Sequence, residues 1–168
     1  AIISMSGDFY FGGKNGFNVF RPDQITDNPH IPPIVLTDFQ IFNKSVDKIY
    51  SRINGKKQLV NISKVDQIKI SYKENVISFE FSALDYGNPT KNKYRYMLEG
   101  FDKDWYDSGV RRFGRYSNLP GGRYTLRIIG SNNDGVWNEK GTAITITVNA
   151  PFWESWWFYL LLALSIIG

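Results

Sequence analysis

Residues 119–132 read Leu119-Pro120-Gly121-Gly122-Arg123-Tyr124-Thr125-Leu126-Arg127-Ile128-Ile129-Gly130-Ser131-Asn132, a turn followed by a strand. Proline and glycine favour the tight turn at its start. From Tyr124 onward, apolar side chains recur at every second position, which is the period of a β-strand with one buried face. Because a buried phenol needs a polar partner, we predict that Tyr124 folds over the corner and that its hydroxyl group bonds a nearby backbone group.

The same alternation recurs in other segments, and turn residues such as Gly87-Asn88-Pro89 and Asp134-Gly135 separate them. The alternating side chains are Val35, Thr37, Phe39 and Ile41; Ile68, Ile70 and Tyr72; Ile77, Phe79, Phe81 and Ala83; Tyr94, Tyr96 and Leu98; and Ile144, Ile146 and Val148. About seven short strands predict an all-β fold, an antiparallel β-sandwich like the immunoglobulin and fibronectin type III domains, which carry a tyrosine at such a corner. No segment before residue 150 has a helical period.

The N-terminal part has a different organisation. Residues 7–20 contain two short aromatic runs around Asn15-Gly16, a pair typical of tight hairpin turns. Because a lone hairpin exposes its edges, we expect this one to pack on the sandwich or on a second copy, partly covering its phenylalanines (Phe9, Phe11, Phe17 and Phe20). Residues 21–33 are polar and proline-rich and predict a linker.

Composition excludes several classes of function. The 168 residues are 42% hydrophobic, 16% aromatic and 21% charged, which is typical of a folded chain. Cysteine is absent, so disulfides, thiolate metal sites and a cysteine nucleophile are excluded. The net charge of +4 is spread along the chain, and its densest cluster, Arg111–Arg115, is interpreted as a solvated turn between strands. Nucleic-acid binding would need a concentrated basic face and is not predicted.

Enzyme chemistry is not predicted either. His30 is the single histidine and lies in the linker, so it is interpreted as a solvated loop residue without a nucleophile or metal ligand beside it. Asp102 and Asp104 flank a turn and are too few for a calcium loop. Asn132, Asn133 and Asp134 are interpreted as turn residues. We therefore predict no catalytic, cofactor or metal site, and no enzyme activity in this chain.

Four aromatic residues leave a second function open. A carbohydrate-binding β-sandwich stacks sugars on a flat aromatic platform, and Trp105, Tyr106, Phe113 and Trp137 are the candidates for one here. The alternative is that these rings fill the core and its rim.

Three segments resemble one known family, the two-component regulator three-Y domain. They are residues 94–105 (Tyr94-Arg95-Tyr96-Met97-Leu98-Glu99-Gly100-Phe101-Asp102-Lys103-Asp104-Trp105), residues 115–124 around Pro120-Gly121, and residues 132–138 with Trp137. The resemblance covers residues 34–150 and implies that Tyr96, Tyr116 and Tyr124 are the three tyrosines, with Gly100, Trp105, Pro120, Gly121 and Trp137 as further structural positions. The N-terminal hairpin resembles the end of a regulator β-propeller.

The resemblance implies a place in a larger receptor. In this family the domain lies between propellers and a transmembrane helix, in the periplasmic part of an inner-membrane sensor that is commonly a hybrid histidine kinase. It implies an oligosaccharide ligand bound outside this chain, by the propellers. The expected function is signal relay and dimerisation, with the propellers, the kinase and a second copy as partners.

The C-terminal segment supports a membrane location. Trp153, Trp156, Trp157 and Tyr159 are amphipathic rings of the kind that gather at membrane interfaces, and an uncharged run follows them. We interpret the segment as the start of a transmembrane helix; the alternative is a soluble helix packed on its own domain. The expected organisation is a propeller remnant and linker at 1–30, the three-Y sandwich at 31–150, and a juxtamembrane and transmembrane segment at 151–168.

Overall fold

The computed structural model describes residues 2–46, 49–53, 56–60, 62–151 and 158, and the regular structure before residue 150 is almost all β. The 3-10 helices are η1 (Pro22–Gln24), η2 (Ile62–Lys64) and η3 (Tyr72–Glu74). The strands are β1 (Ile2–Ile3), β2 (Phe9–Gly13), β3 (Gly16–Phe20), β4 (Ile34–Ile41), β5 (Lys44–Ser45), β6 (Ile49–Ile53), β7 (Lys56–Val60), β8 (Gln67–Ser71), β9 (Ile77–Ala83), β10 (Tyr94–Glu99), β11 (Tyr106–Gly109), β12 (Phe113–Tyr116), β13 (Gly122–Ser131) and β14 (Trp137–Asn149). The prediction of an all-β fold is confirmed.

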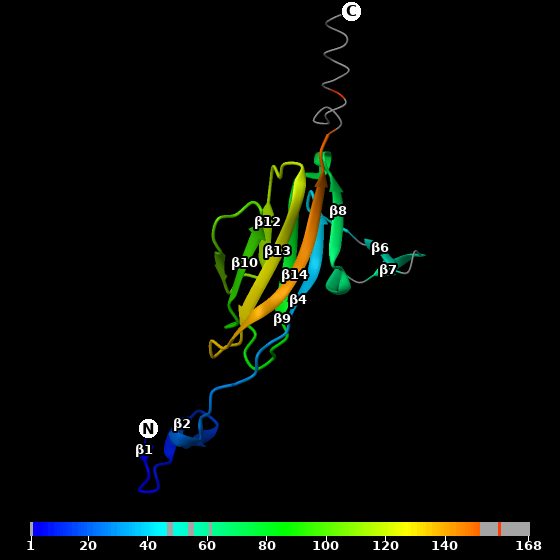
Figure 1. Cartoon of the computed structure of the whole chain (residues 1–168). Helices are drawn as coiled ribbons and strands as arrows, with labels where there is room; N and C mark the ends of the chain where they lie inside the picture. The colour runs from blue at the N-terminus through cyan, green and yellow to red at the C-terminus, as the bar shows by residue number, and fades with distance from the viewer. Residues whose placement is uncertain (1, 47–48, 54–55, 61, 152–157, 159–168) are drawn as a thin grey trace, which may run out of the picture.

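Two facing sheets form the main body of the molecule, which we call the two-sheet body (Figure 1). The larger sheet has the order β11-β10-β13-β14-β8, and the smaller has the order β12-β9-β4-β5. Neighbouring strands of the body pair antiparallel, except that β14 and β8 pair parallel. The predicted purely antiparallel arrangement is therefore wrong at this edge. The chain leaves β8 through η3 into the other sheet, so β8 and β14 are not joined by a hairpin that would make them antiparallel.

The core lies between the two sheets and consists of their inward-facing side chains. The predicted alternation is confirmed in β9 and β10, whose inward residues are buried. The ring of Phe79 meets that of Tyr96 edge-on at 5.3 Å, and Phe81 meets Tyr94 at 5.2 Å, so aromatic pairs join the two layers. Burying such a ring completely stabilises the fold by about 1.5–3 kcal/mol relative to leaving it exposed. The hydroxyl oxygen of Tyr94 accepts a 3.2 Å hydrogen bond from the backbone N–H of Ala83.

Strands β13 and β14 form the longest pairing in the body. Their register runs from Gly122 opposite Val148 to Ser131 opposite Trp137, with an irregularity near Gly130. Gly141 lies in this irregular stretch with φ +54°, and a Cβ there would lie 2.0 Å from the carbonyl oxygen of Ile128. Glycine is therefore required for the two strands to remain paired on both sides of the irregularity.

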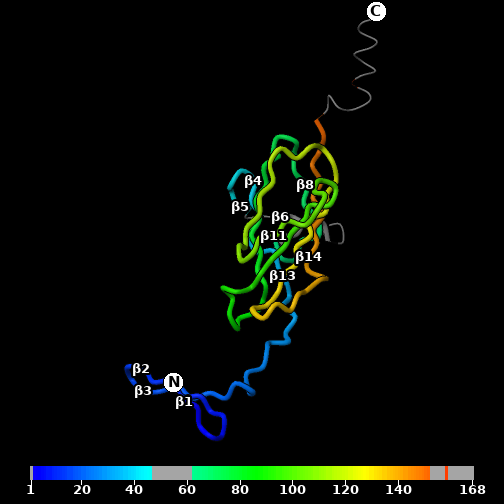
Figure 2. Tube along the Cα trace, turned by 90° about the vertical axis from the view of Figure 1, so that its left-hand side faces the viewer, coloured from blue at the N-terminus to red at the C-terminus, as the bar shows by residue number. Residues whose placement is uncertain are grey.

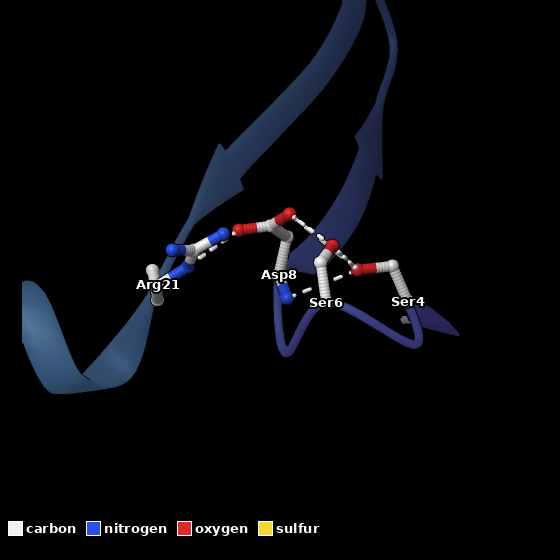
Figure 3. Close-up of polar contacts among 4 residues, drawn as sticks. All are labelled: Ser4, Ser6, Asp8 and Arg21. Atoms are coloured by element: carbon white, nitrogen blue, oxygen red, sulfur yellow. Dashed lines mark hydrogen bonds and ion pairs between the residues drawn. The ribbon is translucent and has the colours of Figure 1, made fainter.

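The N-terminal hairpin is confirmed, but its turn differs from the prediction. Gly13 pairs with Gly16, so Lys14 and Asn15 are the two turning residues, and Gly16 closes the turn with φ +140°. Strand β1 adds to the hairpin and makes a three-stranded sheet. Arg21 Nε donates a 2.9 Å hydrogen bond to Asp8 Oδ1, and Ser6 Oγ donates one of 2.6 Å to Asp8 Oδ2 (Figure 3). These contacts tie the turn before β2 to the start of the linker, and the bond from Ser6 is the main reason that the pKa of Asp8 is lowered.

This small sheet does not pack on the two-sheet body. The linker holds it away from the body in both views (Figure 2). Phe17, Phe11 and Phe20 are 69%, 42% and 39% exposed, so the predicted covering by the sandwich is wrong. Phe11 and Phe20 stack on each other instead, with ring centroids 5.6 Å apart, and Phe17 lies against Tyr10 at 6.0 Å. Packing against a second copy stays a prediction.

The sequence reading missed several strands. Residues 113–116 form β12, so the interpretation of Arg111–Arg115 as a turn holds only for its first two residues. Strand β12 pairs with β9 and forms one edge of the smaller sheet. Strands β6 and β7 form a hairpin that projects from the side of the body (Figure 1).

Candidate functional site: the two ends of the body

The linker enters the two-sheet body at one end, where the side chain of Asn132 holds it. Asn132 Nδ2 donates to the carbonyl oxygens of Asn28 at 2.6 Å and His30 at 3.0 Å. Its Oδ1 accepts from the backbone N–H groups of Asp134 and Val136 at 3.0 and 2.9 Å. Asn132 is 1% exposed, so its own side chain is shielded from water. One amide thus joins the linker to the turn between β13 and β14.

A second asparagine repeats this arrangement one step further along the linker. Asn138 Nδ2 donates to the carbonyl oxygen of Pro32 at 2.9 Å, and its Oδ1 accepts from the N–H of Gly141 at 3.0 Å. The backbone N–H of Leu84 donates to the carbonyl oxygen of Pro33 at 2.8 Å. Because proline has no N–H, the linker offers mainly carbonyl groups here, and amide side chains are suitable donors for them.

Two carboxylates complete the attachment. The backbone N–H of Asn28 donates to Asp134 Oδ2 at 2.8 Å, and its Nδ2 donates to Asp85 Oδ2 at 2.9 Å. His30 is exposed, as predicted, and only its backbone takes part. We call the set Asn28, Asp85, Asn132, Asp134 and Asn138 the linker clasp.

The opposite end of the body carries the tyrosine corner. Tyr124 donates a 3.0 Å hydrogen bond to the carbonyl oxygen of Pro120, which confirms the predicted bond. A Cβ on Gly121 would lie 2.8 Å from Cα of Ala150, so the corner packs directly against the segment where the chain leaves β14. Gly100 has φ +91°, and a Cβ there would lie 3.3 Å from the ring of Tyr124. These glycines allow three backbone segments to meet at one point.

A half-buried hydrogen bond joins the two sheets at the same end. The hydroxyl group of Tyr116, on β12, donates to Asp102 Oδ2, which also accepts the backbone N–H of Leu98 at 2.8 Å. Burial, and then the bond to Asp102, raises the pKa of Tyr116. Burial, and then the charges of Tyr106 and Asp102, raises the pKa of Tyr96 to about 12.

The three tyrosines named from the resemblance lie in one aromatic cluster. The rings of Tyr96 and Tyr116 meet edge-on at 6.0 Å. The ring of Phe101 lies 5.8 Å from that of Tyr116 and 6.3 Å from that of Tyr124, so it links Tyr124 to the pair Tyr96 and Tyr116. The cluster, with Gly100, Pro120 and Gly121, forms what we call the tyrosine end of the body.

The remaining aromatic candidates do not come together. Trp105 and Tyr106 line a cavity beside Tyr96. Trp137 lies on the larger sheet, and the guanidinium carbon of Arg95 is 4.6 Å from the centroid of its ring. Phe113 is 45% exposed on the smaller sheet. A single flat platform of these four rings is therefore not present.

Two further expectations concern metals and the membrane. Within the described ranges, no group of three or more His, Asp or Glu side chains is placed to hold a metal ion. The same ranges contain no helix long and apolar enough to cross a membrane. Trp153, Trp156, Trp157 and Tyr159 lie outside the described residues.

Sequence reasoning identified the tyrosine end but missed the linker clasp. It interpreted Asn132 as a turn residue, which its bond from the N–H of Asp134 confirms. Its other role, holding Asn28 and His30 from 104 and 102 positions away, has no local signal in the sequence. The sequence shows only that asparagine and aspartate are frequent around residues 132–138 and that the linker is rich in proline.

Comparison with known proteins agrees with this geometry. A family model described as the Y_Y_Y domain matches residues 85–149. The chain is 36% identical over 160 residues to histidine kinase P4 of Formosa agariphila, and the match covers 94% of this chain and 11% of that protein. The extracellular domain of the hybrid two component system BT4673 from B. thetaiotaomicron is 32% identical, with a TM-score of 0.62 over 89% of this chain and 19% of that one. The corresponding domain of BT3049 from the same organism is 26% identical, with a TM-score of 0.63 over 88% of this chain and 19% of that one.

These relatives are much longer than the present chain, which spans 11% of the kinase and 19% of each extracellular domain. The resemblance inferred from the tyrosine motifs is confirmed. Residues 85–149 belong to the Y_Y_Y domain family, and the chain as a whole is similar to part of a histidine kinase and to part of the extracellular domain of a hybrid two component system.

Proposed function

We propose that this chain is a relay module of a membrane-bound sensor histidine kinase. It would pass displacement from an extracellular sensing region before it to a membrane segment after it. The observation that carries the proposal is the course of β14. The strand begins beside the linker clasp, where Asn138 holds Pro32, and ends at the tyrosine end, where Gly121 packs on Ala150.

The geometry between the two ends suits mechanical transmission. Strand β14 has 13 residues, a length of about 40 Å at roughly 3.3 Å per residue. It is paired with β13 over most of that length and with β8 near its end. A close-packed body of this kind moves as a unit more readily than it changes shape. Displacement of the linker would therefore reach residue 150 with little loss.

We propose the following organisation of the chain. Residues 1–30 are the remnant of a last propeller blade with its linker, residues 31–150 are an immunoglobulin-like sandwich, and residues 151–168 are a juxtamembrane and transmembrane segment. The exposed rings of β1–β3 support the first part, because an isolated three-stranded sheet with bare aromatic faces suits a larger sheet assembly. The two facing sheets and the bond from Tyr124 to Pro120 support the second.

We also propose that the module lies in the periplasm, attached to the inner membrane, and that the preceding propellers bind an oligosaccharide ligand. The proposal also includes dimerisation, since one helix transmits little alone but two can change their separation or rotation. Single cysteines at Ser155 in the full-length receptor should then cross-link between copies, and ligand should change the yield. Absence of cross-links there and at neighbouring positions, in both states, would contradict the dimer.

The relay is tested by inserting flexible residues where the linker joins the two-sheet body. In the full-length protein in membranes, a Gly-Ser-Gly-Ser insertion between His30 and Ile31 should abolish changes in autophosphorylation caused by a panel of plant and host oligosaccharides. Oligosaccharide binding should persist. The same insertion directly after Ile53, the last residue of β6, is the control and should leave the response intact. An unchanged response with the first insertion would refute transmission through the clasp.

A further inference from the structure

An open cavity of about 420 Å³ lies at the tyrosine end. The edge strands β11 and β12 each contribute lining residues to it. Its buried lining residues are Tyr96 and Tyr116, and its exposed ones include Asp104, Trp105, Tyr106 and Arg115. A volume of this size is within the roughly 300–1,000 Å³ of small-molecule sites.

Two large aromatic side chains are left accessible at this cavity. Trp105 is 37% exposed and Tyr106 is 53% exposed. The ring of Tyr106 lies 5.0 Å from that of Tyr96, and the guanidinium group of Arg127 lies 5.9 Å from the ring of Trp105. A neighbouring group thus lies against each ring. Accessible aromatic surface of this kind is suited to stack on an apolar ligand face.

The charged groups around the rings balance one another. Asp102 and Asp104 contribute two carboxylates, and Lys103 and Arg115 contribute two cations. Among the described residues, Asp104 and Arg115 form no ion pair with another side chain. An anionic ligand would meet the carboxylates, and a cationic ligand would meet Lys103 and Arg115. A neutral ligand whose hydroxyl groups both donate and accept hydrogen bonds satisfies all four groups.

We propose that this cavity binds a neutral sugar unit, with its C–H face on Trp105 and Tyr106 and its hydroxyl groups bonded to Asp104 and Arg115. The site belongs to this domain and differs from the sensing region proposed to precede the chain. It also touches the Tyr116–Asp102 pair that joins the two sheets, so a bound sugar would add contacts between β11 and β12 at the end where the chain leaves the body.

Saturation-transfer NMR with the 168-residue chain tests this site directly. The neutral probes are cellotriose, xylotriose, mannotriose and laminaritriose, and the charged probes are trigalacturonic acid and tetramethylammonium. At least one neutral trisaccharide should bind with a dissociation constant on the order of 1 mM. Trp105→Ala and Asp104→Asn should each weaken that binding about tenfold. Phe113→Ala, which removes an exposed ring of β12 that does not line the cavity, should leave binding unchanged. Thermal unfolding by circular dichroism checks that each variant is folded.

The outcomes separate the alternatives. Failure of all four neutral trisaccharides to bind at 20 mM, a concentration about twentyfold above that constant, overturns the proposal. Binding that survives both Trp105→Ala and Asp104→Asn places the sugar elsewhere and also overturns it. Tighter binding of either charged probe contradicts the predicted chemistry of the ligand. None of these results affects the relay, which the linker insertion tests separately.

Discussion

Tyr124 and Pro120 are joined by a 3.0 Å hydrogen bond from the phenol hydroxyl group to the backbone carbonyl oxygen, four residues earlier in the chain. The bond fixes the turn that carries Gly121, and Gly121 in turn packs on Ala150. A local contact within one turn therefore sets the position of the segment that leaves the body.

Loss of this hydroxyl group should destabilise the fold. We expect Tyr124→Phe to lower the free energy of unfolding by about 1–3 kcal/mol, because the carbonyl group of Pro120 loses its partner. Urea unfolding measures the change. Tyr86→Phe is the matched control, since Tyr86 is 82% exposed. Equal midpoints for Tyr124→Phe and the unmodified chain would show that the corner bond does not stabilise the fold.

Replacing the amide of Asn132 in the linker clasp should change amide exchange only in the linker. Asn132→Asp replaces the donor nitrogen with an oxygen, which faces the carbonyl groups of Asn28 and His30. We expect amide exchange to accelerate in residues 28–33 while the cores of β9 and β10 stay protected. Hydrogen-exchange mass spectrometry shows the pattern, with Asn18→Asp on the exposed β3 as the control. Unchanged exchange in the linker would mean that the clasp does not hold it.

Alanine substitutions at two glycines should distinguish the cost of backbone strain from the cost of a steric clash. Gly135 and Gly141 both have positive φ, but a Cβ on Gly135 meets nothing within 4 Å, whereas one on Gly141 meets the carbonyl oxygen of Ile128 at 2.0 Å. Gly135→Ala should cost about 1–2 kcal/mol from its backbone conformation alone. Gly141→Ala should cost more, because β13 and β14 must also separate. Chemical denaturation of both variants gives the comparison, and equal costs would contradict the tight contact at Gly141.

Alkaline pH should weaken the tyrosine end. The folded state raises the pKa of Tyr96 to about 12, whereas an unfolded tyrosine ionises near pH 10. The stabilisation by the neutral phenol is therefore complete below about pH 10 and is lost as the pH rises from about 10 toward 12. We expect the urea midpoint to fall across this window and to fall less in Tyr96→Phe. An equal fall in Tyr96→Phe and in the exposed control Tyr86→Phe would rule out Tyr96 as the cause.

The sequence by itself determined the local features of this protein. Side-chain alternation identified strands such as β9, β10 and β13, because the two faces of a strand differ at every second residue whatever lies across from them. The turn before Tyr124 and the bond of its hydroxyl group were also predictable, since both partners lie within five residues. The motifs around Tyr96, Tyr116 and Tyr124 were sufficient to identify the family.

Only the tertiary structure decided which distant groups meet. The parallel pairing of β8 with β14, the missed strand β12 and the bond from Asn132 to Asn28, 104 positions away, all depend on how the sheets are assembled. Alternation marks a buried face but not its neighbour, and an amide side chain bonds whichever carbonyl group the fold brings to it. For the same reason the sequence made Trp105, Trp137 and Phe113 equal candidates for one aromatic platform, although they lie on different parts of the body. Their positions follow from strand order, which no local pattern specifies.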